Sequence, residues 1–173
     1  ATVKSMFEKI GQEFFSAPAS SREEYHGCFP GGLADHSLRV THSLVKLAGV
    51  LVPNKYPKEQ LYFLGLMHDL GKVGDGEIPF YVSLEGDQNA WRRRRGEIYG
   101  TNPDLPYMPT CDRTMFLLSK FGIALSAEEF IAIRISDGPY EKSNEKYNMK
   151  EPDLAILLHF ADRWATAIEK ASL

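Results

Sequence analysis

The sequence has few cysteines, little net charge and no long hydrophobic run, and each shortage argues against a class of protein. Its 173 residues include two cysteines, Cys28 and Cys111, which lie far apart and do not form a metal-type pair. We interpret them as thiols of a reducing compartment, with a single disulfide as the alternative. The formal charge of −3 provides no overall attraction to nucleic acid or to an anionic membrane. It does not exclude a local basic patch.

The features of membrane and secreted proteins are also missing. No signal-peptide core occurs, and no apolar run approaches the roughly eighteen residues that a membrane span requires. We therefore expect a soluble, cytoplasmic protein without a membrane partner. The hydrophobic content of 43% and the charged content of 25% are close to globular averages, so we predict one compact domain over residues 1–173.

Apolar residues recur at helical spacing through most of the chain, which predicts an all-α fold. Gly71 is expected to end the third helix, Ser126 and Glu129 form a capping box, and Pro152 lies in the first turn of the last helix. We predict a bundle of five to seven helices. The segments with the helical pattern are 2–15, 33–52, 58–70, 112–122, 126–136 and 151–171.

Residues 74–111 interrupt the helical pattern. They contain many glycines and prolines, and we predict a long irregular insertion with a short hairpin around 79–86. The run WRRRR at 91–95 lies within it. A loop of this length inside a compact domain is usually functional or mobile, so we expect it to flank the site.

Four polar residues are embedded in the apolar helices, namely His36, His68, Asp69 and Asp162. A single histidine such as His36 is most often a satisfied core residue. A buried carboxylate without a partner is costly or becomes protonated, so Asp69 and Asp162 need partners. Two imidazoles and two carboxylates on three helices satisfy one another around a divalent cation. Such ligands suit Mn²⁺, Fe²⁺, Co²⁺, Ni²⁺ or Zn²⁺, and the sequence does not choose among them.

The adjacency of His68 and Asp69 is unusual for two ligands of one ion. Neighbouring residues on a helix point about 100° apart and do not normally share a partner. Near a helix end, however, both side chains can reach a cation that lies beside the axis. We therefore expect His68 and Asp69 to be two ligands from one helix, with His36 and Asp162 arriving from others.

These residues match, in order, the H…HD…D signature of the HD-domain metal-dependent phosphohydrolases, which the chain resembles over about residues 20 to 170. Three blocks occur with the neighbours expected in that family. They are YHGCFPGGLADHSLRV (25–40), LGLMHDLGKV (64–73) and LAILLHFADRWAT (154–166). They are similar to those of small bacterial and phage HD hydrolases and of the HD domain in certain 3′–5′ exoribonucleases. The resemblance implies an HD-domain helical bundle.

The chain departs from the family pattern in one respect. Binuclear members usually add two histidines between the HD pair and the final aspartate. At those places this sequence has LPYMPTCDR (105–113) and IRISDG (133–138), without histidine. We therefore expect one divalent transition-metal ion, with a second, harder ion at Asp137 as the less favoured alternative.

The family resemblance implies hydrolysis of a phosphoester by metal-activated water. The ion would polarise a phosphoryl oxygen and lower the pKa of bound water. Asp69 would orient or deprotonate that water, and Lys72 would meet the negative charge of the phosphate. The alternative for Lys72 is a solvated lysine that complements the dipole at the helix end.

Other residues are predicted to face the substrate. His26 would touch the substrate or donate a proton to the leaving group, or else it is an ordinary surface histidine. Arg92 and Arg93 of the WRRRR run would recruit phosphate groups, or else they pair with the surplus acids of the chain. Asp137 completes the predicted substrate-binding set.

Three hypotheses of function follow. The leading one is a phosphohydrolase acting on a nucleotide or a related phosphorylated metabolite, because the chain is small. The second is a phosphodiesterase or 3′–5′ exonuclease on short single-stranded nucleic acid, with WRRRR and nearby aromatic residues as its platform. The third is a catalytically weak nucleotide-binding regulatory module, which the missing histidines would favour.

Overall fold

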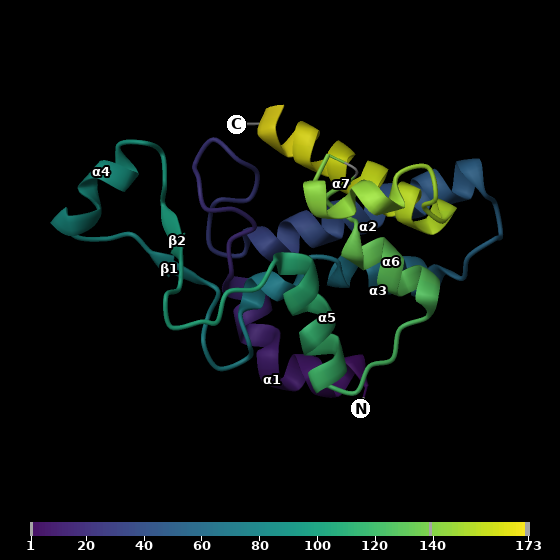
Figure 1. Cartoon of the computed structure of the whole chain (residues 1–173), viewed down its shortest axis with the longest axis horizontal. Coiled ribbons are helices and arrows are strands. Elements are labelled where there is room, and N and C mark those ends of the chain that lie inside the picture. The colour runs from purple at the N-terminus through teal and green to yellow at the C-terminus, as the bar shows by residue number, and fades with distance from the viewer. Residues whose placement is uncertain (1, 139, 172–173) are drawn as a thin grey trace.

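The architecture is a helical bundle from which one β-hairpin arm projects (Figure 1). The computed structural model describes residues 2–138 and 140–171. Their α-helices are α1 (Val3–Ser16), α2 (Gly32–Leu51), α3 (Lys58–Met67), α4 (Ala90–Arg93), α5 (Thr110–Lys120), α6 (Ala127–Arg134) and α7 (Asp153–Ala171). The short elements are the 3-10 helices η1 (Leu70–Val73), η2 (Asp87–Asn89) and η3 (Lys142–Tyr147) and the strands β1 (Tyr81–Ser83) and β2 (Tyr99–Thr101). The predicted all-α class is confirmed.

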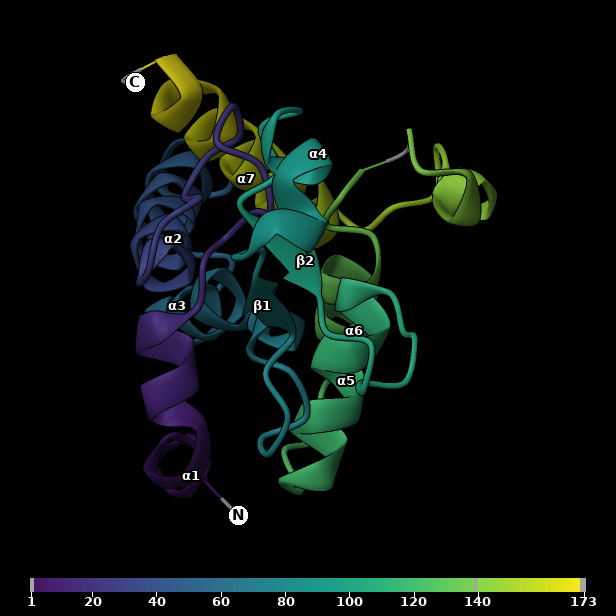
Figure 2. The same ribbon diagram turned by 90° about the vertical axis from the view of Figure 1, so that its left-hand side faces the viewer.

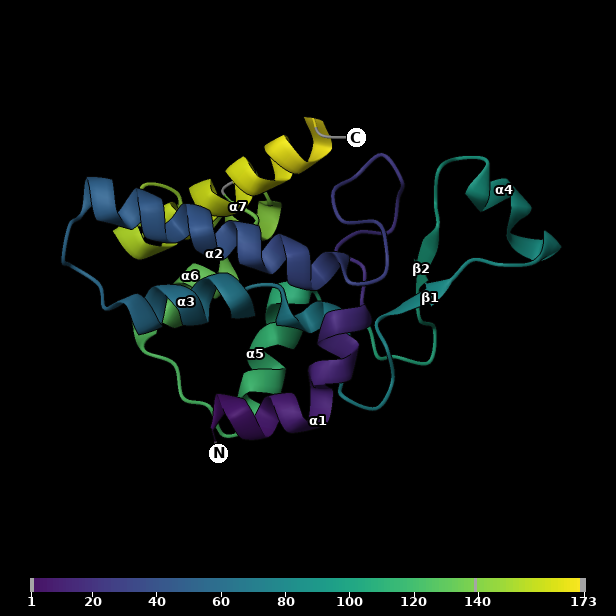
Figure 3. The same ribbon diagram turned by 180° about the vertical axis from the view of Figure 1, so that it is seen from behind.

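The core lies where α2 packs against both α7 and α3, and α6 also packs against α7 (Figure 3). Leu44, Leu64 and Leu158 are among its largest fully buried side chains. Burial of each such leucine contributes about 1.5–3 kcal/mol, so the apolar period read from the sequence is also what stabilises the bundle. Among the described residues, no helix has both the length and the apolar character needed to cross a membrane.

The ends of the later helices follow local signals, with one small correction. The capping box is confirmed, because the Ser126 hydroxyl accepts from the Glu129 amide and the Glu129 carboxylate accepts from the Ser126 amide. Pro152 lies just before α7 rather than in its first turn, since α7 begins at Asp153. The Asp153 carboxylate accepts hydrogen bonds from Tyr56 and Lys55, which fixes the start of α7 against the connection between α2 and α3.

The arm, residues 81–101, corrects the hairpin predicted at 79–86. β1 pairs antiparallel with β2, with Tyr81 opposite Thr101. Because η2 and α4 fill the connection, the partner strand lies well outside the predicted range, and no two-residue turn marks the pair in the sequence. Figures 1 and 3 show the arm extending beyond the bundle, whereas the segment that carries η3 projects elsewhere (Figure 2).

The close approach of α3 to α2 at Gly65 can be tested. A Cβ on Gly65 would lie 2.6 Å from the Cα of Thr41, whereas a Cβ on Gly49 would meet nothing within 4 Å. We expect Gly65→Ala to lower the free energy of unfolding by about 2 kcal/mol, because the two backbones must separate. Gly49→Ala should raise it by up to about 1 kcal/mol through helix propensity. Urea unfolding curves measure both, and similar effects of the two substitutions would contradict this contact.

Candidate metal centre

Three neighbouring elements bring the four predicted ligands together. His36 lies in the second turn of α2, His68 caps α3 and is followed by Asp69, and Asp162 lies in α7. The Nε2 of His36 is 3.1 Å from Oδ1 of Asp162 and 3.6 Å from Oδ2 of Asp69. The Nε2 of His68 is 3.6 Å from the same Asp69 oxygen and 3.9 Å from Oδ1 of Asp162. We call these four residues the ligand cluster.

The backbone changes from α-helix to 3-10 helix at the ligand cluster. α3 ends at Met67 rather than near Leu70 as predicted, and Asp69, with φ −105° and ψ 14°, is no longer α-helical when η1 begins. This break removes the ordinary α-helical separation between adjacent side chains. It allows His68 and Asp69 to face the same point.

Gly71 does not end α3 but lets α5 approach η1. A Cβ on Gly71 would lie 2.3 Å from the carbonyl oxygen of Thr110. The Gly71 amide donates to Oγ1 of Thr114 (2.8 Å), and this hydroxyl donates in turn to the carbonyl of His68 (3.2 Å). The glycine of the HDLGK segment is therefore required by the packing of α5 against the turn that carries both ligands.

Lys72 balances the charge of the ligand cluster. Its Nζ lies 2.5 Å from Oδ2 of Asp69. Burial alone would raise the pKa of Asp69, but the charges of Lys72 and the two histidines outweigh it and hold that pKa below its usual range. Burial would lower the pKa of Lys72, but the charge of Asp69, its hydrogen bond with Lys72 and the charges of Tyr81 and Asp162 together outweigh burial and raise the pKa. Burial also acts to raise the pKa of Asp162, but its hydrogen bond with His36 and the charges of His68 and His36 together outweigh this effect and lower the pKa. Both carboxylates are therefore ionised at neutral pH, the state that binds cations.

Three residues of the ligand cluster, His36, His68 and Asp69, form a buried group that could hold a metal ion. The ligand atoms of His36, His68 and Asp69 all lie within 4.8 Å of one another. Two ligands at about 2.1 Å from one ion are about 3.0–3.4 Å apart, close to the nitrogen–oxygen separations of 3.1 to 3.9 Å found here. The Nε2 of His68 is buried with no hydrogen-bond partner among the described residues, while its Nδ1 lies 2.9 Å from the carbonyl oxygen of Gly65. A ring fixed through one nitrogen with the other left open is the arrangement of a metal-ligating histidine.

Three of the predicted substrate-binding residues lie near the ligand cluster. Lys72 and His26 line a pocket of about 540 Å³, and the His26 ring centroid is 4.5 Å from that of His36. Asp137 follows α6, and its side chain is open to solvent. Even so, neighbouring protein atoms partly desolvate its carboxyl group. This desolvation and the negative charge of Asp69 raise the pKa of Asp137. The roles of these three residues in substrate binding and catalysis stay predictions.

Arg92 and Arg93 are engaged within the arm. Nε of Arg92 donates to the Glu97 carboxylate (2.7 Å), and one guanidinium nitrogen of Arg93 donates to the carbonyls of Leu84 (2.6 Å) and Gly86 (2.7 Å). Both contacts hold the arm together. The structure thus gives each of these arginines a partner other than a phosphate group.

The pocket beside the ligand cluster, which we call the substrate pocket, contains residues that the sequence analysis did not single out. Tyr81 comes from β1, and Arg163 and Thr166 come from α7. Arg163 directly follows the ligand Asp162, and Thr166 lies one turn further along with its hydroxyl 3.4 Å from Oδ1 of Asp162. The four-residue spacing of Thr166 from Asp162 was a usable signal, whereas the adjacency of Arg163 was not. No such signal pointed to Tyr81, because the sequence around it does not predict the strand with which β1 pairs.

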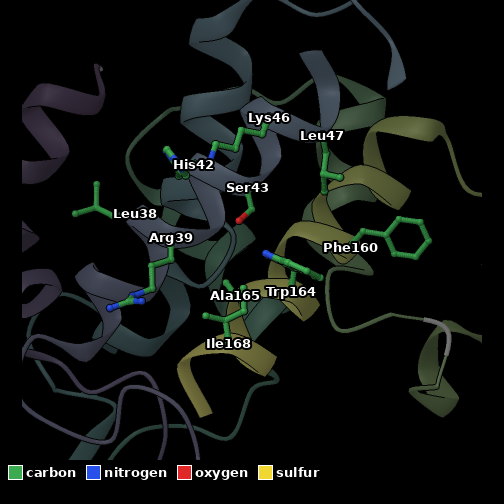
Figure 4. A pocket seen from close by; sticks show the side chains of 10 residues that line it. All are labelled: Leu38, Arg39, His42, Ser43, Lys46, Leu47, Phe160, Trp164, Ala165 and Ile168. Carbon is green, nitrogen blue, oxygen red and sulfur yellow. The ribbon is translucent and has the colours of Figure 1, made fainter. Parts of the chain in front are cut away.

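A second cavity, the apolar groove, lies between α2 and α7 (Figure 4). Its volume is about 680 Å³. Trp164 and Leu38, which are 63% and 60% exposed, lie on its two sides together with Phe160. His42 and Lys46 line it from α2. α7 therefore contributes to the walls of both the apolar groove and the substrate pocket.

Comparison of the chain with family models, with curated proteins and with solved structures returned no match.

Loss of either ligand from the α3 end should abolish metal binding. We expect the chain to retain about one equivalent of Co²⁺ or Mn²⁺ after dialysis, and His68→Ala and Asp69→Asn to lose it. Elemental analysis measures the bound ion. As a second readout, metal at 100 times its Kd should stabilise the unsubstituted chain by about 2.7 kcal/mol and leave both variants unchanged.

The matched control is His42→Ala, which removes an exposed histidine from the same helix as His36. This variant should bind the ion as the unsubstituted chain does. Full retention of the ion by both His68→Ala and Asp69→Asn would show that the ligand cluster is not the metal site.

Proposed function

We propose that the chain is a metal-dependent phosphohydrolase of the HD-domain superfamily, which cleaves a phosphoester of a nucleotide or a related phosphorylated metabolite. The observation that supports this most directly is the ligand cluster itself. Two imidazoles and two ionised carboxylates converge from three elements in the order H…HD…D. The ammonium group of Lys72 lies beside them, at the wall of a pocket.

A divalent transition-metal ion held by the ligand cluster would supply Lewis-acid polarisation of a phosphoryl oxygen and would acidify a bound water. The residues of the chain supply the rest. Lys72 places a fixed positive charge where negative charge develops on the phosphoryl group. Because its pKa is held low, Asp69 is suited to bind and orient rather than to take up a proton at neutral pH. His26, beside His36 at the pocket wall, is positioned to donate a proton to the leaving group.

The size of the substrate pocket favours a small substrate. Its volume of about 540 Å³ falls within the usual range of roughly 300–1,000 Å³ for small-molecule sites. Tyr25 and Tyr81 line it, and either ring could stack on a nucleobase. These features are consistent with a mononucleotide and do not require a polymer.

The arm gives little support to a nucleic-acid substrate. Arginines and carboxylates are equal in number across the arm and the adjoining loop of residues 17–31, so this surface has no net charge with which to attract a phosphate backbone. The arginines are Arg22, Arg92, Arg93, Arg94 and Arg95, and the carboxylates are Glu23, Glu24, Glu85, Asp87 and Glu97. We therefore rank hydrolysis of oligonucleotides below that of small phosphoesters.

A substrate screen tests the proposal. Nucleoside mono-, di- and triphosphates, cyclic nucleotides and short oligonucleotides are each incubated with the chain and Mn²⁺, Co²⁺, Ni²⁺ or Mg²⁺. We expect turnover of a small phosphoester, with Lys72→Met lowering kcat/KM about 100-fold because a charge at the transferring group is lost. Metal content is measured in parallel, since Lys72 also contacts Asp69.

Lys46→Met is the control, because Lys46 is an exposed lysine of α2 that lines the apolar groove. It should leave kcat/KM unchanged. Preference for oligonucleotides would favour the exonuclease alternative. Tight nucleotide binding without any turnover would favour a regulatory module and overturn the proposed activity.

A further inference from the structure

One wall of the substrate pocket is a loop without regular structure. This pocket loop, residues 17–31, contributes Ser20, Ser21, Tyr25 and His26 to the lining. It also brings the ring of His26 against that of the ligand His36. The shape of the pocket loop therefore determines the shape of the pocket beside the ligand cluster.

The pocket loop is hydrogen-bonded to the base of the arm. The carbonyl of Ser21 accepts from the amides of Ile98 (2.9 Å) and Tyr99 (3.1 Å), and the amide of Glu23 donates to the carbonyl of Gly96 (2.9 Å). A guanidinium nitrogen of Arg22 donates to the carbonyl of Arg95 (2.7 Å). Figures 1 and 3 show the pocket loop between the bundle and the arm. Four hydrogen bonds thus join the pocket wall to residues 95–99.

Arg92 fixes that stretch of the arm. Its Nε donates to Glu97, and its carbonyl accepts from the Glu97 amide (3.2 Å), so side chain and backbone hold the same residue. Its guanidinium also lies against β2, because a Cβ on Gly100 would be 3.0 Å from it. Glu97 in turn forms an antiparallel bridge with Arg22 of the pocket loop.

We propose that Arg92 is a positioning residue. Through its pair with Glu97 it holds residues 95–99 of the arm in the conformation that fixes the pocket loop. By fixing this loop, Arg92 sets the affinity for substrate without contacting the substrate. The effect on substrate affinity rests on the proposed phosphohydrolase function, whereas the link from Arg92 to the pocket loop does not. The role differs from phosphate recruitment by the arginine run. In a positioning role the carboxylate of Glu97 matters as much as the guanidinium, while in direct recruitment Glu97 only competes with the phosphate.

The link to the loop is tested by amide hydrogen exchange. We expect Arg92→Ala and Glu97→Ala each to speed exchange at the amides of Glu23, Ile98 and Tyr99 about tenfold, since each removes one partner of the pair. Arg94→Ala is the matched control, because Arg94 is an exposed arginine of the same run. It should leave those rates unchanged. Unchanged exchange in Arg92→Ala would overturn the proposal.

The effect on affinity is tested with the best substrate of the screen. We expect Arg92→Ala and Glu97→Ala to raise KM about tenfold while kcat changes less than about twofold, because the ligand cluster is left intact. The double variant should be no worse than either single variant, as for two residues that act through one contact. Arg92→Lys retains a positively charged donor group but loses the planar guanidinium, and it should recover part of the affinity.

The outcomes separate the possible failures. A raised KM in Arg92→Ala with an unchanged or lowered KM in Glu97→Ala would show direct contact with substrate and overturn the positioning role. Glu97→Gln provides a milder variant if either alanine variant fails to fold. If no ester is hydrolysed, the proposed function fails, while the exchange rates still decide whether Arg92 fixes the pocket loop.

Discussion

The centre of this bundle depends on keeping two ionised carboxylates, Asp69 and Asp162, inside the protein. A buried charge is tolerated only with fixed partners, and removing one partner of such a pair typically costs about 3–5 kcal/mol. Here the partners come from different elements: His36 from α2 and Lys72 from η1. The relative positions of α2, α7 and the end of α3 are therefore set by these polar contacts as well as by apolar packing.

The break in α3 shows how this constraint reaches the backbone. Apolar residues alone would let the helix continue, but the backbone leaves the α-helical region at Asp69, whose Oδ2 lies 3.6 Å from Nε2 of His68. The 3-10 turn that follows is held from outside by α5, through the Thr114 hydroxyl and the close approach at Gly71. α5, which contributes none of the four residues of the ligand cluster, thus stabilises its least regular part.

The helices and the ligand cluster were predictable because their signals are local. The apolar period locates α2 and α7, and charged residues within such helices need partners, which identifies Asp69 and Asp162. Contacts between residues that lie far apart in the sequence were not predictable. The strand that pairs with β1 lies beyond η2 and α4, and a guanidinium such as that of Arg92 accepts a carboxylate, a carbonyl or a phosphate as partner. The end of α3 was missed for the same reason, since the contact that supports its turn comes from α5.

The position of α7 between two cavities has a mechanical consequence. Asp162 faces the ligand cluster and Trp164 faces the apolar groove, and two residues along an α-helix are separated by about 200° of rotation. They therefore occupy nearly opposite sides of one stiff rod. Any turn of α7 about its own axis that widens or narrows the apolar groove carries Asp162 through the same angle relative to His36. A change in the width of the apolar groove would therefore also change the position of the Asp162 carboxylate relative to His36.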